Sequence, residues 1–484
     1  MRAENNKNID IIVIGSGLSG LNFVDTYLEK KQKVHVISPN FNTIVNDNNR
    51  FNNLKALPSQ MEGKNIHINN YFSCNKIKLD KTCKALGSLN RGGLSDYWGL
   101  QLDSYISKNQ KNVKKETIVS IQKNFLEFLK KYKLLGTFYD DKKVLYENDY
   151  ITPNFLNSLL KVKDKFFECK KPILGFFSTK LKKIDLDKLN EKKQKFIAKN
   201  FFRRLKKKKN IKFHNFYVEK IQNFKGKIKI ICKDAKNQNQ YFLAKKVVFA
   251  TGTIVTTKIL LDYLKISKSI KIKHHPRLLG MFFSRKPIKS ILNFTPSLMQ
   301  IINKSKNDYY AADLRPGNRL ITNSIIEAFP FMSRFKIIIN FLRRRLLFSN
   351  ILLDSSFSNI FMKKDKDKYK LFFKSGDLIK KLRQRNYKVF KFLLSKKMIL
   401  PIFKTFYPGN GADYHYFGSI PFGKKGKLSV NNNCQLNSNK NIYIVDGSIF
   451  DFKTNKYPLG IVIANSRRIG RLLSRWVYLE YKSI

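Results

Sequence analysis

The strongest constraint on the fold of this chain is a short apolar run followed at once by three spaced glycines. Ile9–Ile14 is apolar enough to form a buried parallel strand, and Leu21–Lys31 has the pattern of a helix. The turn at 15–20 lies between them and has the spacing G-x-G-x-x-G. Since a second strand is expected at Val34–Ser38, the chain is predicted to open with the strand–helix–strand unit of an α/β fold.

This turn is typical of loops that bind the pyrophosphate of a dinucleotide. Gly15 would allow the tight turn, Gly17 would let a phosphate approach the backbone, and Gly20 would let the helix pack against the strand. The N-terminus of the helix would supply N–H groups and a positive dipole end. An acidic residue usually follows the second strand and binds the ribose, but Ser38 stands there. The turn alone therefore leaves FAD and NAD as alternatives.

Further motifs lie far apart in the chain. The segment 92–98 is GGLSDYW, and the segment 247–253 is VVFATGT. Near the C-terminus, the segment 415–419 is HYFGS and the segment 441–450 is NIYIVDGSIF. Pro458 follows, and a closing helix is predicted directly after it.

In this order and spacing, the motifs resemble the glucose–methanol–choline (GMC) family of flavin-dependent oxidoreductases. The loop at 92–98 is similar to the flavin loop of pyranose oxidase. The resemblance implies an α/β fold of the GMC/PHBH-like kind, in which a Rossmann-like FAD-binding domain is assembled from discontinuous segments and an α+β substrate-binding domain is inserted. The FAD-binding domain would comprise 1–110, 200–275 and 405–484, and the substrate-binding domain 111–199 and 276–404.

The resemblance also implies roles for individual residues. Val218 would meet the adenine, Asp446 and Gly447 would lie on the ribityl–pyrophosphate part, and Pro458 would lie near the pyrimidine end of the flavin. The full predicted cofactor-binding set is Gly15, Gly17, Gly20, Ser38, Gly92, Gly93, Ser95, Val218, Ala250, Gly252, Asp446, Gly447 and Pro458. Tyr97 stands where pyranose oxidase-like proteins carry the histidine that bonds covalently to flavin, so we expect non-covalent FAD. Trp98 would pack near the flavin ring or fill the core.

The implied chemistry is oxidation of a CH–OH group by hydride transfer to flavin N5. The hydroxyl proton needs a base, and a histidine suits this task because its pKa lies near working pH. By the resemblance, His415 is the predicted base. The family places His or Asn before the proline, but Tyr457 stands here and would donate a hydrogen bond to a substrate oxygen. His274 and His275 would line the substrate domain or form a surface turn.

We therefore expect an FAD-dependent enzyme that acts on an alcohol or sugar-like small molecule, as a dehydrogenase rather than an oxidase. The electron acceptor is not indicated by the sequence. The alternative is a catalytically degenerate flavin-binding protein that associates with an anionic surface or partner. An NAD-dependent dehydrogenase would leave the C-terminal motifs unexplained. The five cysteines form no CxxC pair and are expected to be reduced thiols, and we expect no metal site.

The charge of the chain has two interpretations. Lys and Arg number 95 against 34 Asp and Glu, a net charge of +61, which suggests an anionic partner. An A+T-rich genome would also produce many lysines, and the basic residues are spread along the chain. We find no RNA-binding or zinc-finger signature and expect no nucleic-acid partner. The polar N-terminus favours a cytoplasmic location, with peripheral membrane contact as an addition.

Two regions have weaker patterns. Residues 110–200 read as helical and rich in lysine. The segment Phe335–Asp354 mixes isoleucine, leucine and phenylalanine with Arg343, Arg344 and Arg345. It is interpreted as a core-packed helix with a basic outer face, and a helix that lies on an anionic membrane is the alternative.

Overall fold

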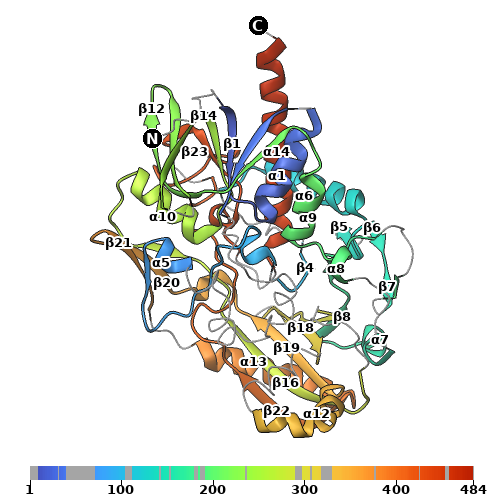
Figure 1. Cartoon of the computed structure of the whole chain (residues 1–484). Helices are drawn as coiled ribbons and strands as arrows, with labels where there is room; N and C mark the ends of the chain where they lie inside the picture. The colour runs from blue at the N-terminus through green and yellow to red at the C-terminus, as the bar shows by residue number, and fades with distance from the viewer. Residues whose placement is uncertain are drawn as a thin grey trace.

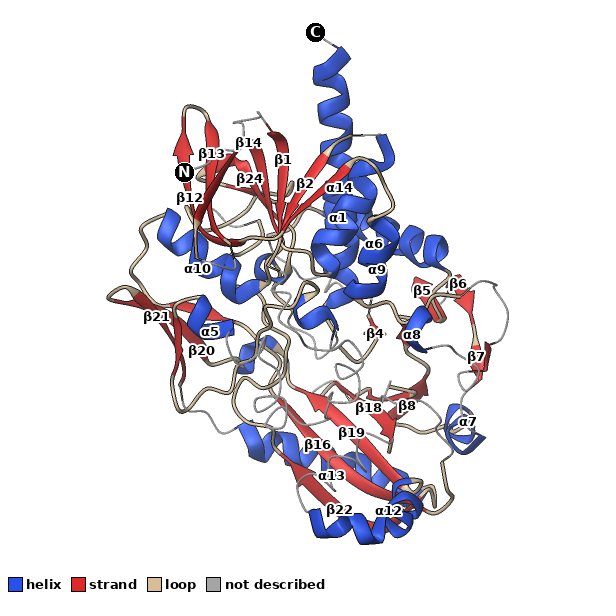
Figure 2. Ribbon diagram, in the orientation of Figure 1, coloured by secondary structure: helices blue, strands red, loops and turns tan. Residues whose placement is uncertain are grey.

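A computed structural model gives the fold as a mixed α/β structure with parallel and antiparallel sheets. Figures 1 and 2 show one large sheet at the top of the molecule and another at the bottom, with the C-terminal helix rising beyond the first. The structure describes residues 9–30, 32–39, 71–96, 98–103, 112–140, 143–151, 154–178, 184–185, 191–234, 237–288, 297–305, 308–317, 330–374, 378–423, 426–452 and 457–482.

The first sheet has eight strands that come from three separate parts of the chain. They are β1 (Ile9–Ile14), β2 (Val34–Ile37), β11 (Ile211–His214), β12 (Tyr217–Phe224), β13 (Lys227–Lys233), β14 (Asn239–Phe249), β23 (Gln435–Leu436) and β24 (Asn439–Ile444). The order is β11-β2-β1-β14-β13-β12, and β24 pairs with the end of β14. Strands β11, β2, β1, β14 and β24 are parallel, whereas β12, β13 and β14 form an antiparallel meander.

The carboxyl ends of the parallel strands meet at one edge of this sheet. Every residue from Ile11 to Ile14 is buried, as expected of a parallel strand covered on both faces. The amide of Gly15 donates to Ile37 O at 2.8 Å, and the amide of Ala250 donates to Ile14 O at 2.8 Å. Helices α1 (Leu18–Tyr27) and α10 (Thr253–Tyr263) begin just beyond this edge. Their N-termini therefore lie beside the ends of β1 and β14.

The second sheet is antiparallel, with the order β22-β16-β19-β18-β17-β8. Its strands are β8 (Phe167–Lys170), β16 (Arg277–Ser284), β17 (Met299–Asn303), β18 (Tyr310–Pro316), β19 (Leu346–Leu352) and β22 (Ile399–Phe406). Helix α13 (Leu378–Ser395) covers one face, where a Cβ on Gly280 would lie 2.5 Å from Asn386 Oδ1. Since strand residues alternate between faces, Arg277, Leu279 and Met281 point to the opposite side.

Smaller elements complete the fold. A four-stranded sheet has the order β15-β20-β21-β3, and three two-stranded pairs are β4–β9, β5–β6 and β7–β10. These strands are β3 (Ile77–Leu79), β4 (Gln101–Leu102), β5 (Gly136–Asp140), β6 (Lys143–Asn148), β7 (Tyr150–Ile151), β9 (Ile173–Leu174), β10 (Ile184–Asp185), β15 (Ile270–Ile272), β20 (Ile360–Asp365) and β21 (Lys368–Phe373). The remaining α-helices are α5 (Tyr71–Cys74), α6 (Lys115–Tyr132), α7 (Asn154–Leu160), α8 (Glu191–Gln194), α9 (Ala198–Leu205), α12 (Lys336–Arg343) and α14 (Leu459–Lys482). Short 3₁₀ turns are η1 (Leu28–Lys30), η2 (Gly93–Asp96), η4 (Pro330–Phe335), η5 (Ser355–Phe357) and η6 (Gly447–Ile449).

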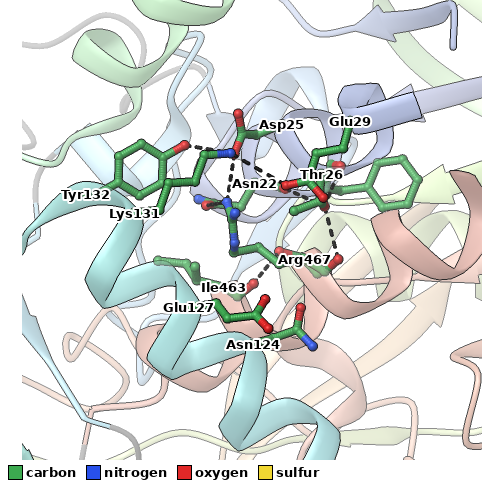
Figure 3. A network of polar contacts seen from close by, with 12 residues as sticks. Asn22, Asp25, Thr26, Glu29, Asn124, Glu127, Lys131, Tyr132, Ile463 and Arg467 are labelled. Atoms are coloured by element: carbon green, nitrogen blue, oxygen red, sulfur yellow. Dashed lines mark hydrogen bonds and ion pairs between the residues drawn. The ribbon is translucent and has the colours of Figure 1, made fainter. Parts of the chain in front are cut away.

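A buried polar network joins the two ends of the chain (Figure 3). Arg467 on α14 is fully buried, and its Nη1 lies 2.9 Å from Oδ2 of Asp25 on α1. Asp25 also accepts hydrogen bonds from Lys131 Nζ at 2.7 Å and from the Tyr132 hydroxyl at 2.8 Å, both on α6. Thr26 Oγ1 donates to the carbonyl of Arg467 at 3.0 Å. The helix that follows the glycine-rich turn is therefore fixed against the helix that follows Pro458.

The structure corrects several sequence-based expectations. Residues 110–200 are helical mainly in α6 and otherwise contain short strands and short helices. Helix α14 starts directly after Pro458, as predicted, and runs to Lys482. The segment 335–354 is no core-packed helix, because α12 ends at Arg343 and β19 follows it. In the described part of the chain, no helix has the length and apolar character needed to span a bilayer.

Candidate functional site

A cavity of about 740 Å³ lies between the two large sheets. Its walls come from the carboxyl ends of β1, β2 and β14, from the loop at 88–96, and from the face of the second sheet that α13 leaves uncovered. This volume is within the range of small-molecule and cofactor sites. The predicted residues that line it are Gly15, Gly17, Ser38, Gly92, Gly93, Ser95, Val218, Ala250, Gly252, His415, Asp446, Gly447, Tyr457 and Pro458.

Gly20 is the one predicted residue that does not line the cavity, and its environment gives the reason. A Cβ on Gly20 would lie 2.2 Å from Gly15 O and 3.2 Å from Ala250 Cβ. A Cβ on Gly15, whose φ is +104°, would lie 2.3 Å from Ala250 O. Gly15 thus makes the turn possible, and Gly20 allows α1 to pack closely against it, while Gly17 faces the cavity.

Two serines hold the loop at 92–96 over the start of α1. Ser95 Oγ accepts a hydrogen bond from the amide of Leu18 at 3.0 Å and donates one to Gly92 O at 2.5 Å. Ser16 Oγ donates to the carbonyl of Arg91, just before this loop, and also lies 2.8 Å from Ser38 Oγ in a hydrogen bond between the two hydroxyls. The Ser38 hydroxyl therefore already has a protein partner at the end of β2, where an acidic side chain would offer two further acceptors.

Asp446 braces the cavity wall through both carboxylate oxygens. Oδ2 accepts from the Gly252 amide at 3.0 Å and from Thr256 Oγ1 at 2.5 Å. Oδ1 accepts from the amide and the hydroxyl of Ser448, at 3.0 and 2.6 Å. Burial raises the pKa of this carboxyl group, and these hydrogen bonds oppose the rise. Asp446 fixes the backbone at Gly252 and Gly447, and both glycines face the cavity.

His415 lines the cavity wall, and the residue as a whole is half-buried. The ring of Tyr457 meets it edge to face, with centroids 5.0 Å apart. Burial lowers the pKa of His415 well below its ordinary value, and the nearby charges of Arg277 and Arg315 lower it further. Its Nδ1 is buried and has no hydrogen-bond partner among the residues that the structure describes. The side chain is therefore a neutral imidazole near pH 7.

A second layer behind His415 was not identified from the sequence. Asp413 Oδ1 accepts from the His415 amide at 3.1 Å, and Asp413 Oδ2 lies 2.5 Å from His274 Nδ1. The His275 ring packs against His415 with centroids 6.0 Å apart, and burial lowers the pKa of His275 to about 4. Both His274 and His275 are fully buried, so the expectation of a surface turn was wrong. The D-x-H spacing of 413 and 415 is the only local signal that could have indicated Asp413.

Tyr457 has a hydroxyl that is already engaged by the second sheet. It accepts from Asn350 Nδ2 at 2.7 Å and from Arg315 Nη2 at 3.0 Å. Burial and the charge of Asp313 raise the pKa of Tyr457 far above its ordinary value. Tyr457 is therefore placed to orient Arg315 rather than to act as a base.

Several buried polar atoms at the cavity have no partner in the described parts of the chain. The side-chain amide of Gln101 on β4 is one case, because both its nitrogen and its oxygen lack a hydrogen bond although the residue is 1% exposed. Arg277 Nη2 and Asn350 Oδ1 are others. All three residues line the cavity. Because buried polar groups are nearly always paired, these atoms indicate that the cavity accepts a polar ligand.

No family model and no curated protein matches this chain.

The second sheet supplies cavity residues that no sequence motif indicates. Arg277, Arg315 and Asn350 lie on β16, β18 and β19, and no motif surrounds them in the sequence. Their shared face follows from strand register, which a single sequence does not give. Trp98 lines the cavity and donates from Nε1 to Phe196 O at 3.1 Å, whereas Tyr97 lies outside the described residues.

Proposed function

We propose that the protein is an FAD-dependent oxidoreductase that oxidises a CH–OH group of an alcohol or sugar-like substrate. One observation carries the proposal: a single cavity runs from the glycine-rich turn at the start of α1 to the neutral ring of His415. The glycine-rich turn is suited to bind a pyrophosphate, and the His415 ring is suited to accept a proton. An oxidoreductase needs both in one continuous space.

The first sheet fits a Rossmann-like FAD-binding domain built from discontinuous segments, with the second sheet in an inserted substrate-binding domain. Gly15, Gly17 and the start of α1 would hold the pyrophosphate, and Ser38 would contribute one hydrogen bond to the ribose. Val218, Ala250 and Gly252 line the same cavity.

The loop over the start of α1 lines the same cavity, and there Gly92, Gly93 and Ser95 would bring backbone close to the FAD. Asp446 would hold Gly447 in place beside it. Pro458 would lie near the pyrimidine edge of the flavin. The unpaired amide of Gln101 offers both a donor and an acceptor, and the pyrimidine edge of a flavin carries both kinds of group. We expect the FAD to be bound without a covalent link.

When bound, FAD would supply the hydride acceptor, at flavin N5. The protein's own contribution is to hold the substrate hydroxyl and remove its proton. His415 takes that proton, because it lines the cavity and its imidazole is neutral. Asp413 holds the backbone of His415, and Tyr457 holds Arg315 at the cavity. Arg277 and Asn350, which line the cavity from the second sheet, would bind substrate oxygens.

The test is anaerobic bleaching of the flavin absorption bands by a panel of alcohols and sugars. The His415→Ala variant should keep the bands and lose bleaching by at least about a hundredfold, the usual scale of a general base. His35→Ala is the control, because His35 pairs with His214 rather than lining the cavity. If His415→Ala bleaches as fast as the parent, His415 is not the base.

The engaged hydroxyl of Tyr457 favours a second candidate, a catalytically degenerate flavin-binding protein. In that case the protein would bind FAD, but no member of the panel would bleach it. Bleaching that depends on His415 would exclude this candidate.

A further inference from the structure

The η4 turn and helix α12, which precede β19 in the chain, expose a set of large apolar side chains. We call this set the α12 patch, and its members are Phe331, Phe335, Ile337, Ile338, Phe341 and Leu342. Ile337 is 86% exposed, the largest value among the exposed large apolar residues of the described chain. Other exposed apolar residues, such as Val119 and Val144, are dispersed along the chain. Contiguous apolar patches on a protein surface usually mark an interaction site.

The orientation of α12 produces this exposure. Ile339 and Arg343, four residues apart, are buried against the protein. The opposite side of the helix carries Ile337 and Phe341, and beside them Ile338 and Leu342, at the same spacing of four. A helix packed on a core would present the reverse arrangement. In Figure 1, α12 lies at the bottom of the molecule, at the end opposite the C-terminus.

Basic side chains surround the α12 patch. Arg334, Lys336 and Arg344 are exposed, and the guanidinium of Arg345 lies 5.7 Å from the centroid of the Phe341 ring. Arg345 Nη1 donates to the carbonyl of Arg285, which is also exposed. The sequence from Pro330 to Leu353 contains no acidic residue. The patch therefore combines an apolar centre with a cationic rim.

We propose that the α12 patch docks the protein peripherally on an anionic lipid bilayer. Such binding requires two contributions. Apolar side chains enter the headgroup region, and cationic side chains pair with anionic lipids. Docking against a second copy of this chain would bring two cationic rims together, on molecules that each carry a net charge of +61. Charge complementarity thus favours the bilayer over self-association. The proposal is independent of the function proposed above.

The experiment is co-sedimentation of the full chain with vesicles, at low and high salt. Vesicles of phosphatidylcholine alone are compared with vesicles that also contain phosphatidylserine. The first double variant combines Ile337→Glu and Phe341→Glu. Its control combines Val119→Glu and Val144→Glu, which add the same charge at two exposed apolar residues elsewhere. The second double variant combines Arg334→Gln and Lys336→Gln. Its control combines Lys363→Gln and Lys368→Gln, at two exposed lysines of the β20–β21 hairpin. Thermal unfolding of each variant confirms that it folds.

The parent should bind vesicles that contain phosphatidylserine, bind phosphatidylcholine far more weakly, and release at high salt. The Ile337/Phe341 variant should lose at least about tenfold in affinity, and the Arg334/Lys336 variant about 25-fold, since each basic residue near the surface contributes about fivefold. Both controls should bind nearly as the parent does. Equal losses in a variant and its control, or no binding by the parent, would overturn the proposal. A parent that is dimeric, and becomes monomeric only on Ile337/Phe341 substitution, would assign the patch to self-association instead.

Discussion

Replacing Asp25 by asparagine should destabilise the protein strongly, because it leaves a buried guanidinium without its counter-charge. Arg467 is 0% exposed, and its Nη1 lies 2.9 Å from Asp25 Oδ2. Its Nε and Nη2 have no hydrogen-bond partner in the part of the chain that the structure describes. The rings of Phe128 and Tyr132, each 5.7 Å away, offer only weak compensation. Breaking such a pair from one side costs about 3–5 kcal/mol of the free energy of unfolding.

Arg467→Met is the matched variant, and it should cost less. It removes the cation but fills most of the volume, and Asp25 keeps Lys131 at 2.7 Å and the Tyr132 hydroxyl at 2.8 Å. Lys208 Nζ also lies 3.4 Å from Asp25 Oδ1. We expect a loss of about 1–2 kcal/mol, since the remaining carboxylate is still paired.

The assay is urea unfolding followed by far-UV circular dichroism, repeated over a range of pH. Burial alone would raise the pKa of Asp25, but the charges of Arg467 and Lys131 hold it well below its usual range. Because the folded-state pKa is depressed, this contribution to stability is complete above the unfolded value near 3.9 and is lost as the pH falls toward the folded value. Asp25→Asn should therefore flatten the loss of stability below about pH 4. If Asp25→Asn lowers the free energy of unfolding by less than about 1 kcal/mol, or if Arg467→Met lowers it more, the buried ion pair does not stabilise the fold as proposed.

Three further predictions concern the cavity. Gly15→Ala should abolish flavin binding or folding, because the added Cβ would lie 2.3 Å from Ala250 O. Gly226→Ala is the control: Gly226 also has a positive φ, +73°, but an added Cβ there would have no atom within 4 Å. It should lower the free energy of unfolding, measured by thermal unfolding, by only about 1 kcal/mol. Since the pKa of His415 is lowered, the rate of flavin bleaching should hold as the pH falls through 6.5 and decline only well below it; half-loss near pH 6.5 would contradict this. Tyr457→Phe removes the hydroxyl that holds Arg315, so steady-state kinetics should show a rise in KM that is larger than the fall in kcat. If Tyr457→Phe lowers kcat more than His415→Ala does, Tyr457 and not His415 takes part in the proton transfer.

The opening of the fold could be predicted because its signals are local. A continuous apolar strand, three glycines at fixed spacing and a helix pattern specify β1, the turn and the start of α1 without reference to the rest of the chain. The same holds for the end of β14 before Gly252 and for the start of α14 after Pro458.

The substrate side of the site depends on long-range register and could not be predicted in this way. Arg277 and Arg315 reach one cavity only because β19 pairs with both β16 and β18. Asp413 contacts His274 across 139 positions of sequence. The apolar stripe of α12 has the same period whether it faces the core or solvent, so periodicity alone suggested burial where the structure has exposure.

We propose that this cavity holds a flavin that a substrate reduces, and an absorption spectrum of the purified protein is the decisive measurement. We expect flavin bands in the protein as purified or after addition of FAD, release of the flavin into solution on denaturation, and anaerobic bleaching by at least one alcohol or sugar. A protein that stays colourless after incubation with FAD would rule out a flavin in this cavity.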